Sequence, residues 1–221
     1  MAIPRGSINH DIFSDLKNFV RTFIDPKICK KASSDTIKIL RNVLSKRYPY
    51  TYFSFLPYAR TSFYATLKAL NIEKGSEILM TPFNISPMSN VLDKLGIKPV
   101  FIDINLNDFG PDYIHLEKLL QKKNVKCFLL TYLFGYVPDL DVIIDLCKKN
   151  KVILIEDISQ NIGAKFKNKP LGTFGEVAFY SASLSKYVDS YNGSFILTKN
   201  KEISYKLEKF SKELSNPSKK R

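Results

Sequence analysis

The chain has 221 residues, 44% of them hydrophobic, which suits one large domain with a buried core. It contains no run of about 18 apolar residues and no charged-then-apolar leader, so we expect a cytoplasmic protein with no membrane partner. The net charge of +13 comes without a recognition-helix, zinc-finger or RNP-like motif, so no nucleic-acid partner is expected, and the charge could equally attract a phosphorylated small molecule.

An apolar stripe at helical spacing is the first predicted element. It consists of Ile12, Phe13, Leu16, Phe19, Val20, Phe23 and Ile24. The spacing predicts an amphipathic helix over residues 12–24, which ends at Asp25-Pro26. Its apolar face could dock on the chain's own core or on a second subunit. A second, shorter helix is predicted over residues 36–46.

Seven strand-like apolar runs follow. They are residues 51–56, 77–80, 99–103, 126–131, 152–156, 177–181 and 194–198. Helical patterns lie between the first five, at about 61–71, 84–95, 112–122 and 139–149. This alternation predicts an α/β fold with a mostly parallel sheet covered on both faces. The last two runs are joined by a short stretch without a helical stripe, so that pair can depart from parallel.

The cysteines and histidines indicate neither a disulfide framework nor a metal site. Cys29, Cys127 and Cys147 are odd in number and widely spaced, which favours buried, reduced thiols. The two histidines, His10 and His115, are too few for a multi-histidine metal site or a histidine-based triad. We therefore expect no metal.

Polar groups follow three of the predicted strands at the points where those strands end. They are a hydroxyl pair that opens a helix, an acidic pair, and a serine followed by a lysine: Thr61-Ser62, Glu156-Asp157, and Ser181 with Lys186. Because the carboxyl ends of parallel strands meet at one edge of a sheet, we expect these groups to lie close together.

A phosphate cradle, a carboxylate and a lysine are the groups that pyridoxal phosphate (PLP) requires. Its aldehyde forms a Schiff base with a lysine, its ring nitrogen is kept protonated by a carboxylate, and its phosphate binds at a helix N-terminus. Each group alone is commonplace, and a loop lysine is usually only solvated. Their occurrence in this order is much rarer and indicates a PLP site.

Residues from about 50 to 213 resemble the DegT/DnrJ/EryC1/StrS family of PLP-dependent sugar aminotransferases, a branch of fold-type I. The most specific segment carries the family spacing of Gly135, Pro138, Glu156-Asp157, Gln160, Gly163, Gly172 and Gly175. The resemblance implies a three-layer α-β-α large domain with a mostly parallel seven-stranded sheet. It also implies PLP as the cofactor and transfer of an amino group, usually from glutamate, to a nucleotide-linked keto-deoxysugar.

The resemblance also implies roles for individual residues. Lys186 matches the Schiff-base lysine, Asp157 matches the partner of the pyridinium nitrogen, and these two would be the catalytic residues. Gln160 matches the residue that approaches the phenolic oxygen of the cofactor. The positions of the phosphate ligands are occupied by Thr61, Ser62 and Ser181.

Several positions depart from the family pattern. Ala59-Arg60 replaces a small residue followed by Gly, and Ile85, with Phe83 nearby, occupies the position where relatives often stack an aromatic ring. Asn192-Gly193-Ser194 replaces an acidic-Gly-Gly sequence, and residues 1–35 are unmatched.

The chain is expected to divide into a helical segment (1–48), a PLP-binding large domain (49–213) and a basic tail (214–221). Family members are nearly twice as long, with a C-terminal small domain that closes over the substrate. Their active site lies at a dimer interface, so the resemblance implies a homodimer.

Two functions remain open. The first is PLP-dependent transamination of a nucleotide sugar in the synthesis of a surface polysaccharide or a deoxyaminosugar, or, as a weaker variant, of a non-sugar ketone. The second is a truncated, non-catalytic relative that retains the fold as a cofactor-binding or dimerisation module.

Overall fold

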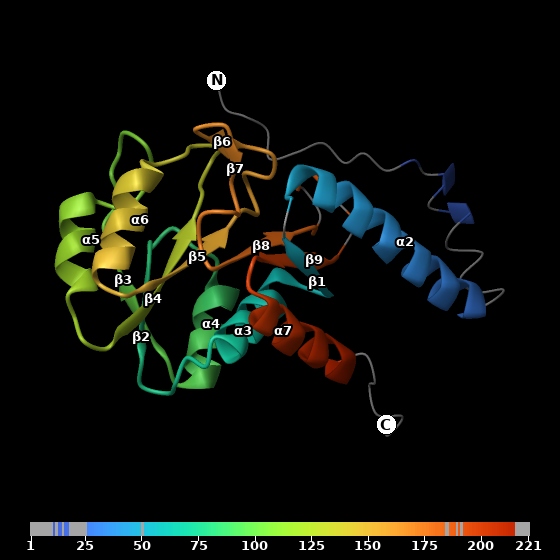
Figure 1. The fold of residues 1–221 in the computed structure, drawn as a ribbon, viewed down its shortest axis with the longest axis horizontal. Coiled ribbons are helices and arrows are strands. Elements are labelled where there is room, and N and C mark those ends of the chain that lie inside the picture. Colours follow the sequence, from blue (N-terminus) through green and yellow to red (C-terminus); the bar gives the residue numbers. More distant parts are fainter. Residues whose placement is uncertain are drawn as a thin grey trace.

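The computed structural model describes residues 11, 13–14, 16–17, 26–49, 51–183, 186–188, 190 and 192–214, with side-chain surroundings left undescribed for 26–34. In this part of the chain a seven-stranded sheet is covered by helices on both faces (Figure 1). The predicted three-layer α/β architecture is therefore confirmed.

The strands form one mixed sheet in the order β1-β9-β8-β5-β4-β2-β3. Their bounds are β1 Tyr52–Leu56, β2 Glu77–Met80, β3 Lys98–Phe101, β4 Val125–Thr131, β5 Ile153–Asp157, β8 Val177–Ser181 and β9 Ser194–Thr198. Strands β8, β5, β4, β2 and β3 are parallel, whereas β9 is antiparallel to both of its neighbours. The described residues of the link from β8 to β9 form no crossover helix, and β9 returns antiparallel, the departure from a parallel sheet that the sequence left open.

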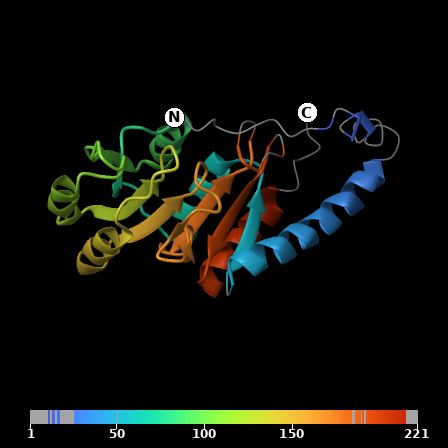
Figure 2. The ribbon, with the colours of Figure 1, turned by 90° about the horizontal axis from the view of Figure 1, so that it is seen from above.

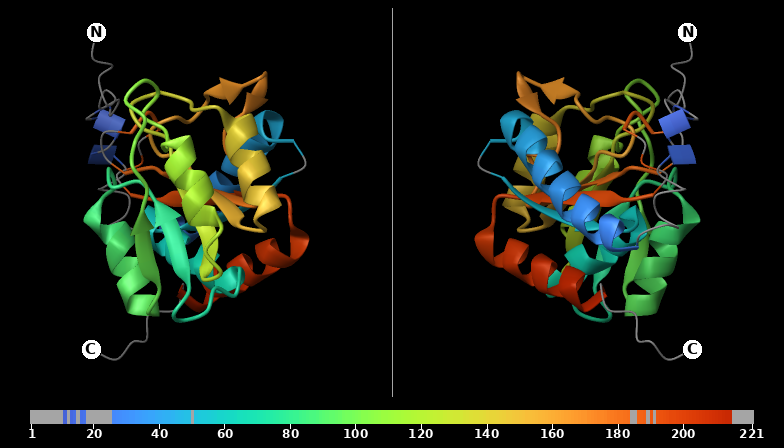
Figure 3. Two further views of the ribbon diagram at one scale, coloured as in Figure 1. Left: turned by 90° about the vertical axis from the view of Figure 1, so that its left-hand side faces the viewer. Right: turned by 90° about the vertical axis from the view of Figure 1, so that its right-hand side faces the viewer.

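Helices of the two outer layers follow the sheet connections. Their bounds are α3 Ala59–Ala69, α4 Ser86–Leu95, α5 Tyr113–Leu120, α6 Leu140–Lys149 and α7 Lys201–Leu214. Helices α5 and α6 pack on one face, and α3, α4 and α7 pack on the other, as the end views in Figure 3 show. Asp139 begins α6 by accepting hydrogen bonds from the Asp141 and Val142 amides, a typical N-cap arrangement.

Strand β4 shows how the sheet divides the core into two halves. Phe128 and Leu130 face the core beneath α5 and α6, whereas Cys127 and Leu129 face the core beneath α3, α4 and α7. All four are buried, because this strand lies inside the sheet with helices above and below. Burial raises the pKa of the Cys127 thiol to about 12, which keeps it protonated.

The other two cysteines, Cys147 and Cys29, can also be compared with the prediction of buried, reduced thiols. Cys147 of α6 is also a buried free thiol, and burial raises its pKa to about 12. Cys127 and Cys147 confirm the expected reduced thiols, whereas the side chain of Cys29 lies outside the described residues.

The N-terminal region differs from its predicted bounds. Helix α2 spans Pro26–Arg47 and so begins well before the predicted start at residue 36. It projects beyond the β1 edge of the sheet (Figure 2), and its C-terminal end is fixed by a hydrogen bond from Arg47 Nη2 to the Gly163 carbonyl oxygen at 2.6 Å. The predicted stripe of residues 12–24 lies mostly outside the described residues. Its described members Phe13 and Leu16 are exposed.

A two-stranded hairpin and helix α7 were absent from the predicted set. Strands β6 (Lys165–Phe166) and β7 (Lys169–Pro170) form a short antiparallel hairpin, whose turn residues Lys167 and Asn168 have φ values of 46° and 63°. Hairpin turns of this kind usually carry glycine, so the sequence lacked the strongest signal for a hairpin.

No helix among the described residues is long and apolar enough to cross a membrane.

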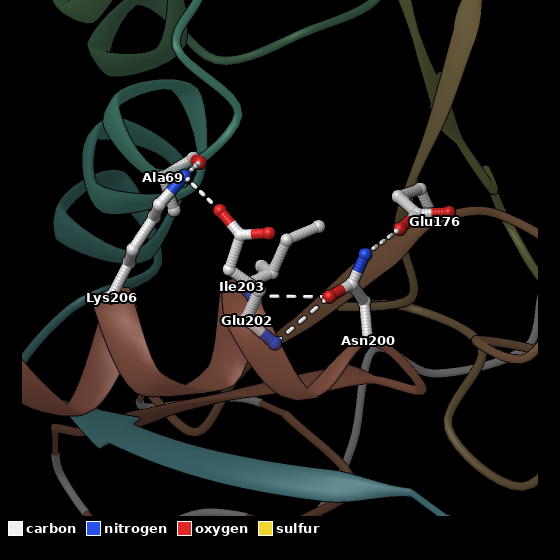
Figure 4. A network of polar contacts seen from close by, with 6 residues as sticks. All are labelled: Ala69, Glu176, Asn200, Glu202, Ile203 and Lys206. Atoms are coloured by element: carbon white, nitrogen blue, oxygen red, sulfur yellow. Dashed lines mark hydrogen bonds and ion pairs between the residues drawn. The ribbon is translucent and has the colours of Figure 1, made fainter.

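Helix α7 is the second added element, and its first turn is fixed by Asn200 (Figure 4). The Asn200 Oδ1 atom accepts hydrogen bonds from the Glu202 and Ile203 amides, and Nδ2 donates to Glu176 at 3.0 Å. Lys206 pairs with Glu202 at 2.8 Å one turn later. These contacts anchor α7 to the loop before β8.

Candidate functional site

The site predicted from the sequence lies where the parallel strands end. Strands β2, β4, β5 and β8 finish at this edge, β9 begins there, and α3 starts directly after β1. The segments that follow these strands include every residue proposed from the sequence to hold the cofactor. The chain topology therefore brings them to one edge.

Asp157 is the buried carboxylate of this edge. It ends β5, is only 5% exposed, and its Oδ1 atom accepts a hydrogen bond from the Ser159 amide at 3.0 Å. Burial raises the pKa of Asp157 above its ordinary value of 3.8, while hydrogen bonds from Ser159 and the positive charge of Lys186 act in the opposite direction. The carboxylate is thus placed where a nearby cation would stabilise its charged form.

Lys186 lies in the turn after β8 and is half-buried. Its amide donates a hydrogen bond to the Ser183 carbonyl oxygen at 3.2 Å. Its charge lowers the pKa of Asp157, so the turn brings the lysine within electrostatic reach of that carboxylate. The fold thereby brings near each other two groups that lie apart in the sequence.

Helix α3 supplies the predicted phosphate cradle, but its two hydroxyl residues have different surroundings. Because the first intrahelical bond runs from the Ser62 amide to the Tyr58 carbonyl oxygen, the amides of residues 59–61 precede it. Thr61 is half-buried beside these amides. Ser62 is fully buried, and its Oγ lies 2.8 Å from Ser194 Oγ at the start of β9. The Ser62 hydroxyl therefore joins the helix to the sheet.

Serine contacts join the ends of β5 and β8. The Ser181 amide donates to Ser159 Oγ at 3.1 Å, and Ser181 Oγ lies 3.1 Å from Ser183 Oγ. Ser159 also contacts Asp157. Ser159 contacts both residues, so it links Ser181 to the Asp157 carboxylate.

Gln160 holds the turn that follows β4. Its Oε1 atom accepts a hydrogen bond from the Phe134 amide at 3.1 Å, and Asn161 Oδ1 accepts one from the Gly135 amide at 3.2 Å. Phe134 and Gly135 have φ values of 53° and 86°, a left-handed conformation that such anchoring maintains. Gln160 is half-buried at the same edge as Asp157.

Glu156 has a structural role that its place beside Asp157 does not reveal. Its fully buried carboxylate accepts hydrogen bonds from the Tyr132 hydroxyl and from the amides of Gly172, Phe174 and Gly175, at 2.7–2.8 Å. Burial raises its pKa, and these four hydrogen bonds oppose the shift. Adjacent residues of a strand point to opposite faces of the sheet, and this alternation could have indicated that Glu156 and Asp157 have different roles.

The loop after β2 presents apolar side chains at the same edge. Phe83 and Ile85 are 62% and 60% exposed, and Asn84 Nδ2 donates to Thr131 Oγ1 at the end of β4 at 2.9 Å. Neither apolar side chain is packed into the core. Within the described residues, no cluster of three or more His, Cys, Asp or Glu side chains could hold a metal ion.

Comparison with known proteins gives a family and a fold. Residues 60–221 match the model of the DegT/DnrJ/EryC1/StrS aminotransferase family. A pleiotropic regulatory protein of Geobacillus stearothermophilus is 31% identical over 141 residues, which cover 63% of this chain and 38% of that protein. A GDP-perosamine synthase of Escherichia coli O157:H7 is 26% identical over 137 residues, which cover 62% of this chain and 37% of that protein.

Among solved structures, a GDP-4-keto-6-deoxymannose-3-dehydratase mutant with bound GDP-perosamine superimposes with a TM-score of 0.76 at 23% identity. The match covers 91% of this chain and 53% of that one, and at this identity it shows the fold alone. The matched part of this chain spans less than two fifths of the length of the two curated relatives, at 38% and 37%.

Proposed function

The chain belongs to the DegT/DnrJ/EryC1/StrS aminotransferase family, and from this premise we propose that it carries the cofactor site of a PLP-dependent sugar aminotransferase. The observation that carries the proposal is that buried Asp157 and Lys186 lie within electrostatic reach of each other at the sheet edge where α3 begins. The proposed substrate is a nucleotide-linked keto-deoxysugar, with glutamate as amino donor, because a GDP-perosamine synthase is among the relatives.

The residues at the edge fit the groups of PLP. A protonated ring nitrogen beside Asp157 would stabilise a carboxylate whose burial raises its pKa. The aldehyde would attach to the amine of Lys186. The phosphate would bind the first amides of α3 with Thr61 and Ser181, whereas Ser62 would contribute by fixing the helix to Ser194. Gln160 would approach the phenolic oxygen.

Bound PLP supplies an electron sink for the carbon that carries the transferred amino group. The remaining chemistry belongs to side chains of this chain. Asp157 would hold a positive charge on the ring nitrogen, and the Lys186 amine would take and return the proton of the reacting carbon as a general base. Both roles require the two residues on the same edge, where the fold brings them.

A non-catalytic function is the second candidate. It is favoured by the share of each relative that this chain matches, 38% and 37%, because substrate-binding residues of those proteins can lie outside the matched part. In that case residues 49–213 would form a cofactor-binding or dimerisation module. The first candidate is preferred because Asp157 and Lys186 are both present and lie within electrostatic reach of each other.

Absorbance spectroscopy separates the candidates. The transaminase predicts a visible band when PLP is added, borohydride fixation of the cofactor on a peptide that contains Lys186, and loss of the band when glutamate is added. A band that glutamate leaves unchanged would support the module. Fixation on any other lysine would contradict the site, and Lys149→Ala, which alters an exposed lysine of α6, is the matched control for Lys186→Ala.

A further inference from the structure

The hydroxyl of Tyr180 contacts the turn that carries Lys186. Tyr180 lies in β8 and is fully buried. Its Oη atom donates a hydrogen bond to the Val188 carbonyl oxygen at 3.0 Å and accepts one from the Val188 amide at 2.8 Å. One side chain of the sheet thus binds both backbone groups of a residue that follows Lys186 closely in the chain.

The ring of Tyr180 is a rigid support for this contact. It stacks on Phe195 of β9 with a centroid distance of 5.1 Å and an interplanar angle of 29°. The Tyr180 carbonyl oxygen also accepts a hydrogen bond from Ser194 Oγ at 2.7 Å. Because both the ring and the backbone are held by β9, the hydroxyl has a fixed place in the sheet.

The described residues of this turn include two with exposed apolar side chains, Tyr187 and Val188. The side chain of Val188 is exposed, so this residue is attached through its backbone. At the base of the turn the Ser190 amide donates to the Ala182 carbonyl oxygen at 3.0 Å. A tyrosine hydroxyl offers one donor and one accepting oxygen, and Tyr180 uses both on Val188.

We propose that Tyr180 is a positioning residue, whose hydroxyl sets the place of the Lys186 amine relative to Asp157. This inference depends on the proposed function in one respect, because that function is what gives Lys186 a role in the reaction. The geometry of the turn is independent of any bound group. Tyr180→Phe is a sharp test, since phenylalanine retains the stacked ring and removes both contacts to Val188.

Two measurements on the full chain without cofactor test the proposal. The first is hydrogen exchange of the Val188 amide, followed by NMR, with the Ile196 amide of β9 as internal reference. The second is the rate at which acetic anhydride labels Lys186, measured by mass spectrometry relative to Lys118 and Lys149. In Tyr180→Phe we expect both the Val188 exchange and the relative Lys186 labelling to rise about five- to tenfold, the factor that one or two lost hydrogen bonds predict.

Tyr64→Phe is the matched control, because Tyr64 packs on Phe210 between α3 and α7, away from the turn. It should leave both readouts unchanged. Equal values in Tyr180→Phe and the unaltered chain would overturn the proposal. So would faster exchange at Val188 without a change at Lys186, or an equal rise in the labelling of all lysines, which indicates general loosening.

These outcomes are separable from failure of the proposed function. Neither measurement requires PLP, so a chain that develops no visible band with the cofactor would contradict the function and leave the result for Tyr180 intact. If the band does form, Tyr180→Phe should reduce the fraction of Lys186 fixed by borohydride at limiting PLP.

Discussion

Glu156 and Asp157 are neighbours in β5, yet their carboxylates have unlike surroundings. Glu156 receives a tyrosine hydroxyl and three backbone amides, whereas Asp157 receives hydrogen bonds from Ser159 alone among the described residues. Hydrogen bonds of this kind offset the desolvation of a buried carboxylate. Asp157 is less well compensated, and a positively charged group nearby would stabilise it.

We therefore expect Asp157→Asn to preserve or raise the stability of the cofactor-free chain. Burial raises the pKa of Asp157 in the folded chain above 3.8. The stabilisation of the folded chain that comes from the protonated form of Asp157 is therefore complete below about pH 4 and is lost as the pH rises through the folded pKa. At pH 7 the variant should be more stable by roughly 1 kcal/mol, while transamination falls by several orders of magnitude.

Urea unfolding from pH 4 upward measures this difference, which should widen as the pH rises through the folded pKa of Asp157. Asp145→Asn, which alters an exposed carboxylate of α6, is the control and should show no such trend. Marked destabilisation of Asp157→Asn at pH 7, or normal turnover, would mean that Asp157 is a structural strand-end residue.

The placement of individual residues was only partly predictable. Asp157 and Lys186 could be assigned from the order of polar groups along the chain, because strand ends converge in any parallel sheet. The inward orientation of the Ser62 hydroxyl could not, since it depends on how α3 rotates against β9. The role of Tyr180 depends on a contact between side chain and backbone that has no periodic signature.

Helix α3 is joined to the sheet by a short chain of buried hydroxyls. Ser62 Oγ lies 2.8 Å from Ser194 Oγ, and Ser194 Oγ donates to the Tyr180 carbonyl oxygen at 2.7 Å. Both serines are nearly or fully buried, so the Ser62 hydroxyl depends on Ser194 for a partner, and Ser194 in turn bonds Tyr180. The start of the helix and the strand behind it are thereby coupled.

A double-mutant cycle should reveal this coupling. Ser194→Ala should destabilise the chain by about 1–3 kcal/mol, because it leaves the buried Ser62 hydroxyl without its partner. Ser62→Ala should cost less, because Ser194 Oγ keeps its hydrogen bond to the Tyr180 carbonyl oxygen, and the double variant should lose less than the sum. Urea unfolding measures all four proteins. Ser45→Ala on the exposed side of α2 is the control, and strictly additive effects would contradict the coupling.

At the level of elements, the sequence predicted the seven strands of the main sheet within two residues. Long apolar runs bounded by polar residues specify buried strands well, as at residues 126–131 and 194–198. The hairpin β6–β7 was missed because each strand has two residues, too few to show the alternation of apolar and polar residues that indicates a strand. The true start of α2 was missed because the residues before 36 carry no apolar stripe.

Exposed apolar side chains lie in the segments that border the site. They are Phe83, Ile85, Phe134, Tyr136 and Tyr187, with exposed fractions from 45% to 62%. They belong to turns after three different strands that end at the same edge. Apolar side chains gathered in this way favour burial against another surface, and a second copy of the chain would cover the site as well.

We expect a homodimer of about 50 kDa, twice the mass of the 25.3 kDa chain, in light scattering at micromolar concentration. Replacing both Phe83 and Ile85 by Lys should shift the equilibrium toward the monomer by at least tenfold, since burial of each side chain contributes about 1.5–3 kcal/mol. Tyr205→Lys on α7, also an exposed apolar residue, is the control and should leave the mass unchanged. A monomer in the unaltered protein would contradict the dimer.

The antiparallel strand β9 has a consequence for the order in which the sheet is completed. It lies between β1 and β8, so β1 joins the rest of the described sheet through β9, the last of the described strands in chain order. On a ribosome, residues 52–56 would wait for residues 194–198 to emerge before they could pair, and closing so long a loop is entropically slow. Helix α3 begins directly after β1, so the proposed phosphate-binding end of this helix would be among the last parts of the site to reach its place.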